Sequence, residues 1–435
     1  MHKKTFSIVN LGCPKNTVDS EIIKGNLIRH SFQFREEASE ADTVIINTCG
    51  FLDKSREESI DTILEVAELK KSGRLKKLLV AGCLSERYPD ELRAELPEVD
   101  QFFGAHTMKN VVEYMTGKHF LAYDPTLWRS LLTPPHYAYF KIAEGCDNVC
   151  SFCAIPGMRG RQVSKTVDAL LREASMLAEK GVRELMLIAQ DLSTYGYDLN
   201  PKVSLTQLLR ELDQVEGINW IRLHYLHPSH IGPELIPFLA SGPKRILPYI
   251  DMPLQHSSSR LLKMMKRGLD GPGISRLLSR MRQEIPGLSL RTAMIVGFPG
   301  ETEEEFRELA DFVKEQRFER LGVFTYSEEE GTSAAELTDD VPPELKEARQ
   351  AELMEIQQAI NLQHNESLIG TVQTVLIDSY NEAENISYGR TYRDSPEIDN
   401  QVLVRSELPV GEFSRVRITG AMEYDLLADP ADSAD

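Results

Sequence analysis

The chain has 435 residues, of which 41% are hydrophobic and 27% charged, and its formal net charge is −18. This length predicts two to four domains, and the composition is that of a globular protein rather than of a disordered or membrane protein. The acidic balance argues against non-specific binding to phosphate backbones and favours a basic partner. No apolar run is long enough to cross a bilayer and no secretion signal is recognisable, so we expect a cytoplasmic protein.

The six cysteines divide into three that are widely spaced and three that lie within eight residues. Disulfides are the expected use of cysteine in small secreted proteins, whereas a large chain without a secretion signal belongs to a reducing compartment. Metal binding or catalysis is therefore the better interpretation of all six.

Residues 1–118 alternate short apolar strands with helical patterns, which predicts an open parallel α/β sheet. Cys13, Cys49 and Cys83 each follow one of three predicted strands. Because the carboxyl ends of parallel strands share one edge of the sheet, these cysteines can converge although they are about 35 residues apart. The alternative is that they are three unrelated core residues. Strands are expected at 6–10, 43–47 and 77–81, and helices at 17–30 and 52–71.

Residues 132–366 contain six apolar strand candidates separated by helical stretches. Six βα units are fewer than the eight of a closed barrel, so we predict a partial, open-sided (β/α)6 barrel with its site at the carboxyl ends of the strands. The acidic stretch 327–344 is expected to be a solvated loop. The predicted strands are 137–142, 185–189, 221–225, 247–251, 288–296 and 321–326, and the helices include 163–180, 205–215, 257–266, 301–315 and 343–368.

Residues 368–435 carry short strand patterns at 372–378, 386–391, 402–404 and 413–420, which predict a small antiparallel β-barrel. This part has thirteen acidic residues, five arginines and no lysine, so its balance is −8, and −5 without the tail 428–435. A module that docks on RNA shows a basic footprint instead. An acidic module suits a basic protein partner.

The spacing of Cys146, Cys150 and Cys153 follows the pattern C-x3-C-x2-C, directly after the first predicted barrel strand. Three thiolates on one loop can hold three irons of a 4Fe–4S cluster and leave the fourth iron open for S-adenosylmethionine. A structural zinc site needs four ligands, and a ferredoxin motif needs a fourth nearby cysteine. In this sequence no second cysteine pair lies near the loop, and no further cysteine follows Cys153. A metal site at the alternating histidines His224, His227 and His230 is a weaker hypothesis, since they lack helical spacing.

The C-x3-C-x2-C loop is identified as the signature of the radical S-adenosylmethionine superfamily. Three further cysteines after N-terminal strands, the barrel and a small final β-barrel together resemble the methylthiotransferases throughout the chain. Their last domain is the TRAM type, known mostly as an RNA-binding module. Within the family, details resemble the branch that modifies an aspartate of small-subunit ribosomal protein S-twelve; the matching stretches are 11–20, 155–160, 190–191 with 195–196, 253–256 and 389–399.

Two features distinguish this branch from the tRNA-modifying branch. The tRNA enzymes usually have Gln-Ser-Gly at the place of Gln255, His256 and Ser257, and they usually lack the Pro-Lys-Asn run found here at 14–16. Thr17 departs from the family pattern, which more often has an apolar residue there. The resemblance implies addition of a methylthio group to the β-carbon of the aspartate, on the free protein or on the assembled ribosomal subunit.

The resemblance also implies cofactors and their ligands. Cys146, Cys150 and Cys153 are expected to hold the radical-generating 4Fe–4S cluster, and Cys13, Cys49 and Cys83 an auxiliary 4Fe–4S cluster whose open iron carries the sulfur. S-adenosylmethionine is expected to supply both the methyl group and the radical, and a flavodoxin or ferredoxin the electrons. The expected cofactor-binding residues are Phe152, Gln190, Arg222, Gln255, Arg291 and Gly297.

Several alternatives stay open at this point. For Gln190, Arg222, Gln255 and Arg291, a structural role in the barrel rim is an equal alternative. Gly297 lies in a Gly-Pro turn that also occurs without any ligand. The competing functions are a tRNA adenosine methylthiotransferase, which the acidic last part disfavours, and a non-catalytic iron–sulfur carrier; a zinc protein is more remote.

Overall fold

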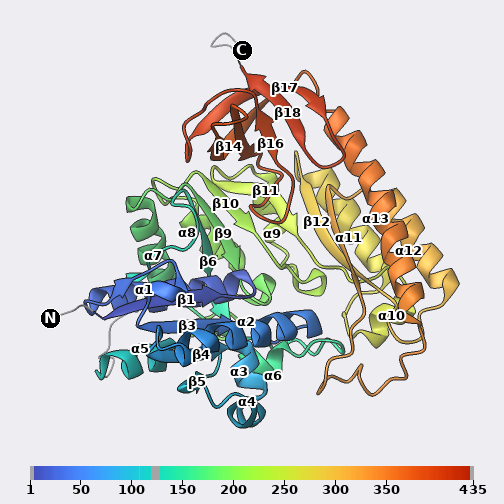
Figure 1. Cartoon of the computed structure of the whole chain (residues 1–435). Helices are drawn as coiled ribbons and strands as arrows, with labels where there is room; N and C mark the ends of the chain where they lie inside the picture. Colours follow the sequence, from blue (N-terminus) through green and yellow to red (C-terminus); the bar gives the residue numbers. More distant parts are fainter. Residues whose placement is uncertain (1–3, 107, 119–127, 432–435) are drawn as a thin grey trace.

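The computed structural model describes residues 4–106, 108–118 and 128–431, and these form three packed parts. The N-terminal sheet and the C-terminal β-barrel lie at opposite ends of the central barrel (Figure 1). Across the described residues, no helix combines the length and apolar character that a membrane span requires. Residues 432–435 of the predicted acidic tail lie outside the described residues.

The N-terminal part is a five-stranded parallel sheet in the order β2-β1-β3-β4-β5. The prediction of an open parallel α/β sheet is therefore confirmed. Its strands bury apolar side chains on both faces, since Val44 and Ile46 belong to one core cluster and Ile45 to another. Its elements are β1 (Thr5–Asn10), α1 (Pro14–Arg29), β2 (Gln33–Phe34), η1 (Ala38–Glu40), β3 (Thr43–Thr48), α2 (Asp53–Lys71), β4 (Lys77–Gly82), α3 (Cys83–Arg87), α4 (Pro89–Glu95), β5 (Gln101–Phe103) and α5 (Met108–Thr116).

Helix α1 begins at Pro14, three residues earlier than predicted. Proline is favoured at the first helical position because its missing N–H would be unpaired there in any case. The earlier start places Lys15 and Asn16 in the first turn, directly after Cys13. The helix buries polar residues, among them Asp19 and Glu21, because this face packs against the first strand of the central barrel.

The central part is a six-stranded parallel sheet in the order β13-β12-β11-β10-β9-β6, which is also the order of the chain. Within the described residues β6 and β13 are the two edges of this sheet, so the barrel is open, as predicted. Its strands are β6 (Tyr137–Lys141), β9 (Glu184–Ile188), β10 (Trp220–Leu223), β11 (Ile246–Asp251), β12 (Ser289–Val296) and β13 (Arg320–Thr325).

The helices of the central part cover the outer side of the sheet and share its main apolar core. The helix predicted from 163 begins only at Val167, because Val163–Ser164 pairs as β8 with β7 (Ala143–Glu144), and Thr166 caps the helix. The remaining elements are α6 (Ile155–Arg159), α7 (Val167–Glu179), η3 (Leu192–Thr194), α8 (Leu205–Leu212), η4 (Pro228–His230), α9 (Leu235–Ala240), α10 (Ser259–Met264), α11 (Gly271–Glu284) and α12 (Glu303–Gln316).

The long helix α13 (Pro343–Glu366) leads to the C-terminal part, a closed barrel in the order β14-β15-β16-β18-β17. Strand β18 was not predicted, and it pairs in parallel with β16, whereas the other pairs of this barrel are antiparallel. The strands are β14 (Val372–Asn381), β15 (Ile386–Arg390), β16 (Val402–Val404), β17 (Phe413–Ala421) and β18 (Leu426–Pro430).

The acidic stretch 327–344 is not wholly solvated, so this prediction is wrong at Glu329. Its side chain is only 2% exposed and accepts hydrogen bonds from Arg56 and Arg87, each at 2.7 Å. Both arginines belong to the N-terminal part. The two guanidinium groups compensate the cost of burying one carboxylate, and they hold this loop of the central part against the N-terminal part.

Candidate functional site

Cys13, Cys49 and Cys83 lie at the edge of the N-terminal sheet where its strands end. Glycines that precede two of them, Gly12 and Gly82, have positive φ angles of +107° and +108°. A Cβ on Gly12 would lie 2.9 Å from the Cβ of Cys49, so only glycine lets these two strand ends approach each other. The sheet topology therefore brings the three sulfurs to one edge.

Cys146, Cys150 and Cys153 lie on the loop between β7 and α6. The helix α6 connects this loop to the other three cysteines, because its residue Met158 packs against Cys83 in a small buried apolar cluster. Helix α6 therefore links the two groups of cysteines at the junction of the N-terminal sheet and the central barrel, because the loop of one group leads into α6 and α6 packs against Cys83 of the other.

One buried and two half-buried thiols, from both groups, have raised pKa values that favour the protonated form. Burial raises the pKa of Cys83 and of Cys146 to about 11 and that of Cys153 to about 12, and neighbouring cysteines add to each shift. Iron ligation requires thiolates, so loading of the site must release protons.

The donor set fits iron–sulfur clusters. It comprises six sulfurs in two groups of three, each one ligand short of the four that hold a cluster completely. A site for a single metal ion is a different arrangement. In the described part of the chain, no three or more His, Cys, Asp or Glu side chains are arranged to hold one metal ion, so His224, His227 and His230 do not form such a site there.

An arginine donates a hydrogen bond to one sulfur of each group. The Nε of Arg159 lies 3.2 Å from the Sγ of Cys83, and the Nη1 of Arg267 lies 3.2 Å from the Sγ of Cys150. A guanidinium group stabilises a thiolate and the negative charge of a cluster. Neither arginine was singled out from the sequence, although Arg159 lies in the stretch 155–160 that carries the family resemblance.

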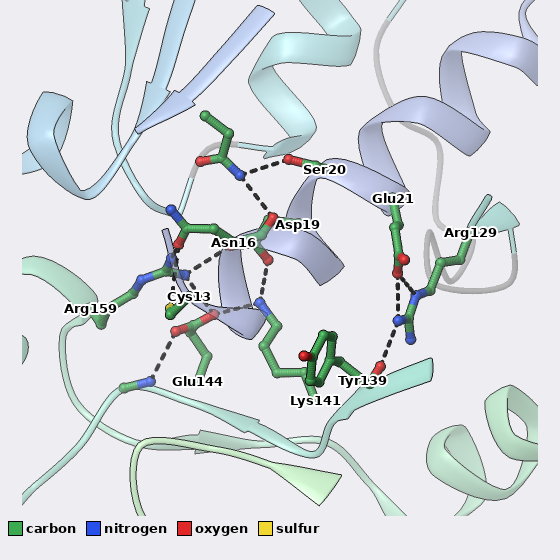
Figure 2. Close-up of polar contacts among 12 residues, drawn as sticks. Cys13, Asn16, Asp19, Ser20, Glu21, Arg129, Tyr139, Lys141, Glu144 and Arg159 are labelled. Atoms are coloured by element: carbon green, nitrogen blue, oxygen red, sulfur yellow. Dashed lines mark hydrogen bonds and ion pairs between the residues drawn. The ribbon is translucent and has the colours of Figure 1, made fainter. Parts of the chain in front are cut away.

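A buried charge network joins α1 to the central barrel (Figure 2). Asp19 pairs with Lys141 and, at 2.9 Å, with Arg159, and Glu144 pairs with the same two cations at 2.6 and 3.2 Å. Burial opposes the ionisation of Glu144, but the charges of Lys141 and Arg159 outweigh it and lower the pKa of Glu144. Lys15, in the first turn of α1, is 92% buried, and this burial lowers its pKa. The network fixes the two cysteine groups relative to each other.

Four of the predicted cofactor-binding residues lie near the carboxyl ends of the barrel strands. Phe152 packs against the apolar cluster that contains Phe298. Gln190 donates to Glu144 at 2.9 Å, and its buried Oε1 has no hydrogen-bond partner among the described residues. Gln255 and Gly297 both have positive φ angles, +78° and +71°. The free acceptor of Gln190 is a feature that suits a ligand.

The two predicted arginines lie elsewhere. Arg222 is fully buried inside β10 and donates to Glu184 at 2.9 Å and to the carbonyl of Tyr392 at 2.7 Å. Arg291 is the third of eight residues in β12, and it pairs with Asp251 and Asp399. Both guanidinium groups thus bind the C-terminal part. Their contact with a cofactor stays a prediction.

Family models match the three parts of the chain. Residues 5–104 match the uncharacterized protein family UPF0004, residues 140–313 the radical SAM superfamily, and residues 369–430 the TRAM domain.

Curated relatives match almost the whole chain. A ribosomal protein uS12 methylthiotransferase RimO from an Anaeromyxobacter species is 48% identical over 96% of this chain and 91% of the relative. Relatives of the same name are 46% identical in Cytophaga hutchinsonii, over 98% of each chain, and 47% identical in a Thermoanaerobacter species, over 98% of this chain and all of the relative.

Solved structures resemble the fold at low sequence identity. The radical S-adenosylmethionine methyltransferase TsrM from Kitasatospora setae superimposes with a TM-score of 0.55 at 13% identity, over 86% of this chain and 81% of that chain. The cobalamin-dependent radical enzyme OxsB superimposes with a TM-score of 0.51 over 82% of this chain and 56% of that one. These likenesses concern the fold alone.

The superfamily match implies one 4Fe–4S cluster and S-adenosylmethionine, and the relatives make the chain a transferase. With a relative 48% identical over nearly the whole length, the chain belongs to the RimO family of radical S-adenosylmethionine methylthiotransferases.

Proposed function

We propose that this enzyme adds a methylthio group to the β-carbon of an aspartate in uS12, the ribosomal protein S-twelve of the small subunit. The observation that carries the proposal is that α6 links two three-cysteine groups, each with an arginine on one sulfur. The uS12 specificity in the names of relatives that are 46–48% identical supports the substrate.

The first cysteine group would hold the cluster that binds S-adenosylmethionine. Cys146, Cys150 and Cys153 ligate three irons, and the bound cofactor supplies a radical that can remove hydrogen from an unactivated carbon. Arg267 stabilises the thiolate of Cys150.

Four side chains or backbone segments at the strand ends would complete the cofactor pocket. Phe152 presents its backbone to the adenine, and the turn at Gly297 lets the backbone approach the adenosine. Gln190 and Gln255 bind the polar groups of the cofactor, and the unpaired Oε1 of Gln190 supports this role.

The second group, Cys13, Cys49 and Cys83, would hold an auxiliary 4Fe–4S cluster with one iron free to carry the sulfur. An external flavodoxin or ferredoxin would supply the electrons. In this division, residues 1–118 form the auxiliary-cluster domain, 132–366 the radical domain, and 368–435 the domain that meets the substrate.

The charge of the last domain supports a basic protein substrate, although part of it is used internally. Asp378, Asp394 and Asp399 pair with arginines of the protein itself. Other acidic side chains of the same domain are exposed: Glu382, Glu407 and Glu423, and also Glu384 and Glu412, which contact Tyr388 and Arg183. Such a surface suits uS12 better than tRNA.

The test is anaerobic reconstitution of three proteins: the wild type, a Cys146→Ala, Cys150→Ala, Cys153→Ala variant, and the matched variant of Cys13, Cys49 and Cys83. We expect about eight irons in the wild type and about four in each variant. Loss of the first group should abolish cleavage of S-adenosylmethionine, whereas loss of the second should abolish only the transfer to uS12, measured by mass spectrometry. Equal iron in all three proteins, or transfer to tRNA instead of uS12, would contradict the proposal.

A further inference from the structure

Lys15 is a buried cation at the junction of the two cysteine groups. It lies two residues after Cys13 in the first turn of α1, and only 8% of its surface is exposed. Its Nζ lies 3.5 Å from the centre of the Tyr225 ring, which follows β10 of the central barrel. The side chain therefore extends from the N-terminal sheet to the carboxyl end of the barrel.

The ammonium group of Lys15 has no hydrogen bond or ion pair within the described residues 4–106, 108–118 and 128–431. A ring face compensates a buried charge only in part, and an isolated buried cation is costly. The neighbouring cations differ in this respect. Lys141 is paired with Asp19 and Glu144, and Arg159 is paired with the same two carboxylates.

The carboxylates that act on Lys15 electrostatically are already used by other cations. Glu144 is paired with Lys141 and Arg159, and Asp251 is paired with Arg291 at 3.1 Å. Besides the Cys13 sulfur, the protein thus leaves Lys15 without a carboxylate of its own where the two cysteine groups meet. An anionic group from outside the chain would complete it.

We propose that Lys15 determines specificity for the target side chain, because its ammonium group pairs with the carboxylate of the aspartate that receives the methylthio group. This inference rests on the proposed function. In an aspartate the carboxylate carbon is bonded directly to the β-carbon. A carboxylate held two residues from Cys13 therefore fixes the reacting carbon beside the auxiliary cysteine group.

The experiment compares two forms of uS12, the natural protein and one with its modified aspartate changed to asparagine. Binding to the anaerobic enzyme, loaded with iron and S-adenosylmethionine, is measured for the wild type, Lys15→Met, Lys15→Arg and the control Lys54→Met. Lys54 is an exposed residue of α2, which belongs to the same N-terminal part as Lys15. The wild type and Lys54→Met should bind natural uS12 at least about tenfold more tightly than the asparagine form. Lys15→Met should bind both forms equally weakly, and Lys15→Arg should keep part of the preference.

Each outcome decides the inference. If the wild type modifies uS12 but Lys15→Met keeps the full preference for aspartate, the inference is wrong. A shift in the reduction potential of the auxiliary cluster, with the preference unchanged, would show that Lys15 is instead a counter-charge for the cluster. If Lys15→Met loses iron, its binding cannot be compared, and the preference of the wild type and of Lys15→Arg for natural uS12 tests the inference instead. Equal binding of both uS12 forms to the wild type overturns the inference. Failure of the wild type to bind or modify uS12 at all would instead overturn the proposed function.

Discussion

Both ends of the central barrel contain buried ion pairs, but they differ in the groups that lie beside these pairs. At the amino end, arginines and carboxylates of the barrel and the C-terminal part pair with each other. Glu184 is fully buried between Arg222 and Arg390, at 2.9 and 2.8 Å. At the carboxyl end, burial raises the pKa of the Cys83 thiol, and the ammonium group of Lys15 lies on the Tyr225 ring without a hydrogen-bond or ion-pair partner among the described residues.

This difference separates stability from chemistry. The carboxylates and guanidinium groups of the network at the amino end pair with each other, although Nη2 of Arg222 has no hydrogen-bond partner among the described residues, so the network holds two parts of the protein together. Groups that lack a partner in the folded chain are available to a cofactor or a substrate. We therefore interpret the amino end as a structural joint and the carboxyl end as the candidate reactive site, in agreement with the rule for barrels of this type.

The largest expected effect comes from breaking the joint at Glu184. Glu184→Ala leaves Arg222 and Arg390 buried without their shared carboxylate and should lower the free energy of unfolding by about 3–5 kcal/mol. Urea unfolding of the iron-free chain measures it. Glu211→Ala, at an exposed position of α8, is the control and should change stability by less than about 0.5 kcal/mol. Equal effects of the two substitutions would mean that the joint adds nothing.

A second experiment tests the protonation of the thiols at the carboxyl end. The pKa of Cys83 is raised from 9.0 to about 11, so at pH 8 its thiolate fraction in the folded iron-free chain should be about a hundredfold below that in the unfolded chain. Its alkylation by iodoacetamide should be slower by about the same factor and should accelerate as the pH rises toward 11. Mass spectrometry of the modified peptides gives the rates. Equally fast alkylation in folded and urea-unfolded chains would refute the shift.

The smallest effect is expected where the joint meets solvent. Glu397 is exposed, yet it accepts hydrogen bonds from the hydroxyl groups of Tyr137 and Tyr139, both at 3.0 Å. Glu397→Ala should cost only about 0.5–1 kcal/mol in urea unfolding, because water replaces an exposed carboxylate more easily than a buried one. A loss as large as that of Glu184→Ala would place Glu397 inside the joint.

The sequence predicted most strands because buried parallel strands form continuous apolar runs. Residues 43–47 and 77–81 match β3 and β4 to within one residue. The strands β2 and β5 have two and three residues, too few to show any periodicity, and β18 follows a turn with a weak pattern. The early start of α1 was missed although Pro14 signals a first helical position.

For the site, the sequence by itself determined which cysteines are the candidate ligands. Spacing alone identified Cys146, Cys150 and Cys153 as a loop that can hold a cluster, and strand ends identified the other three cysteines, since both signals are local. Tertiary structure alone decided which charges are paired. Nothing in the sequence distinguishes these arginines from one another. In the structure Arg222 and Arg291 bind the C-terminal part, whereas Arg159 and Arg267 contact cysteine sulfurs. A charged side chain takes its role from the partner that packing brings within reach, and that partner is often more than a hundred residues away.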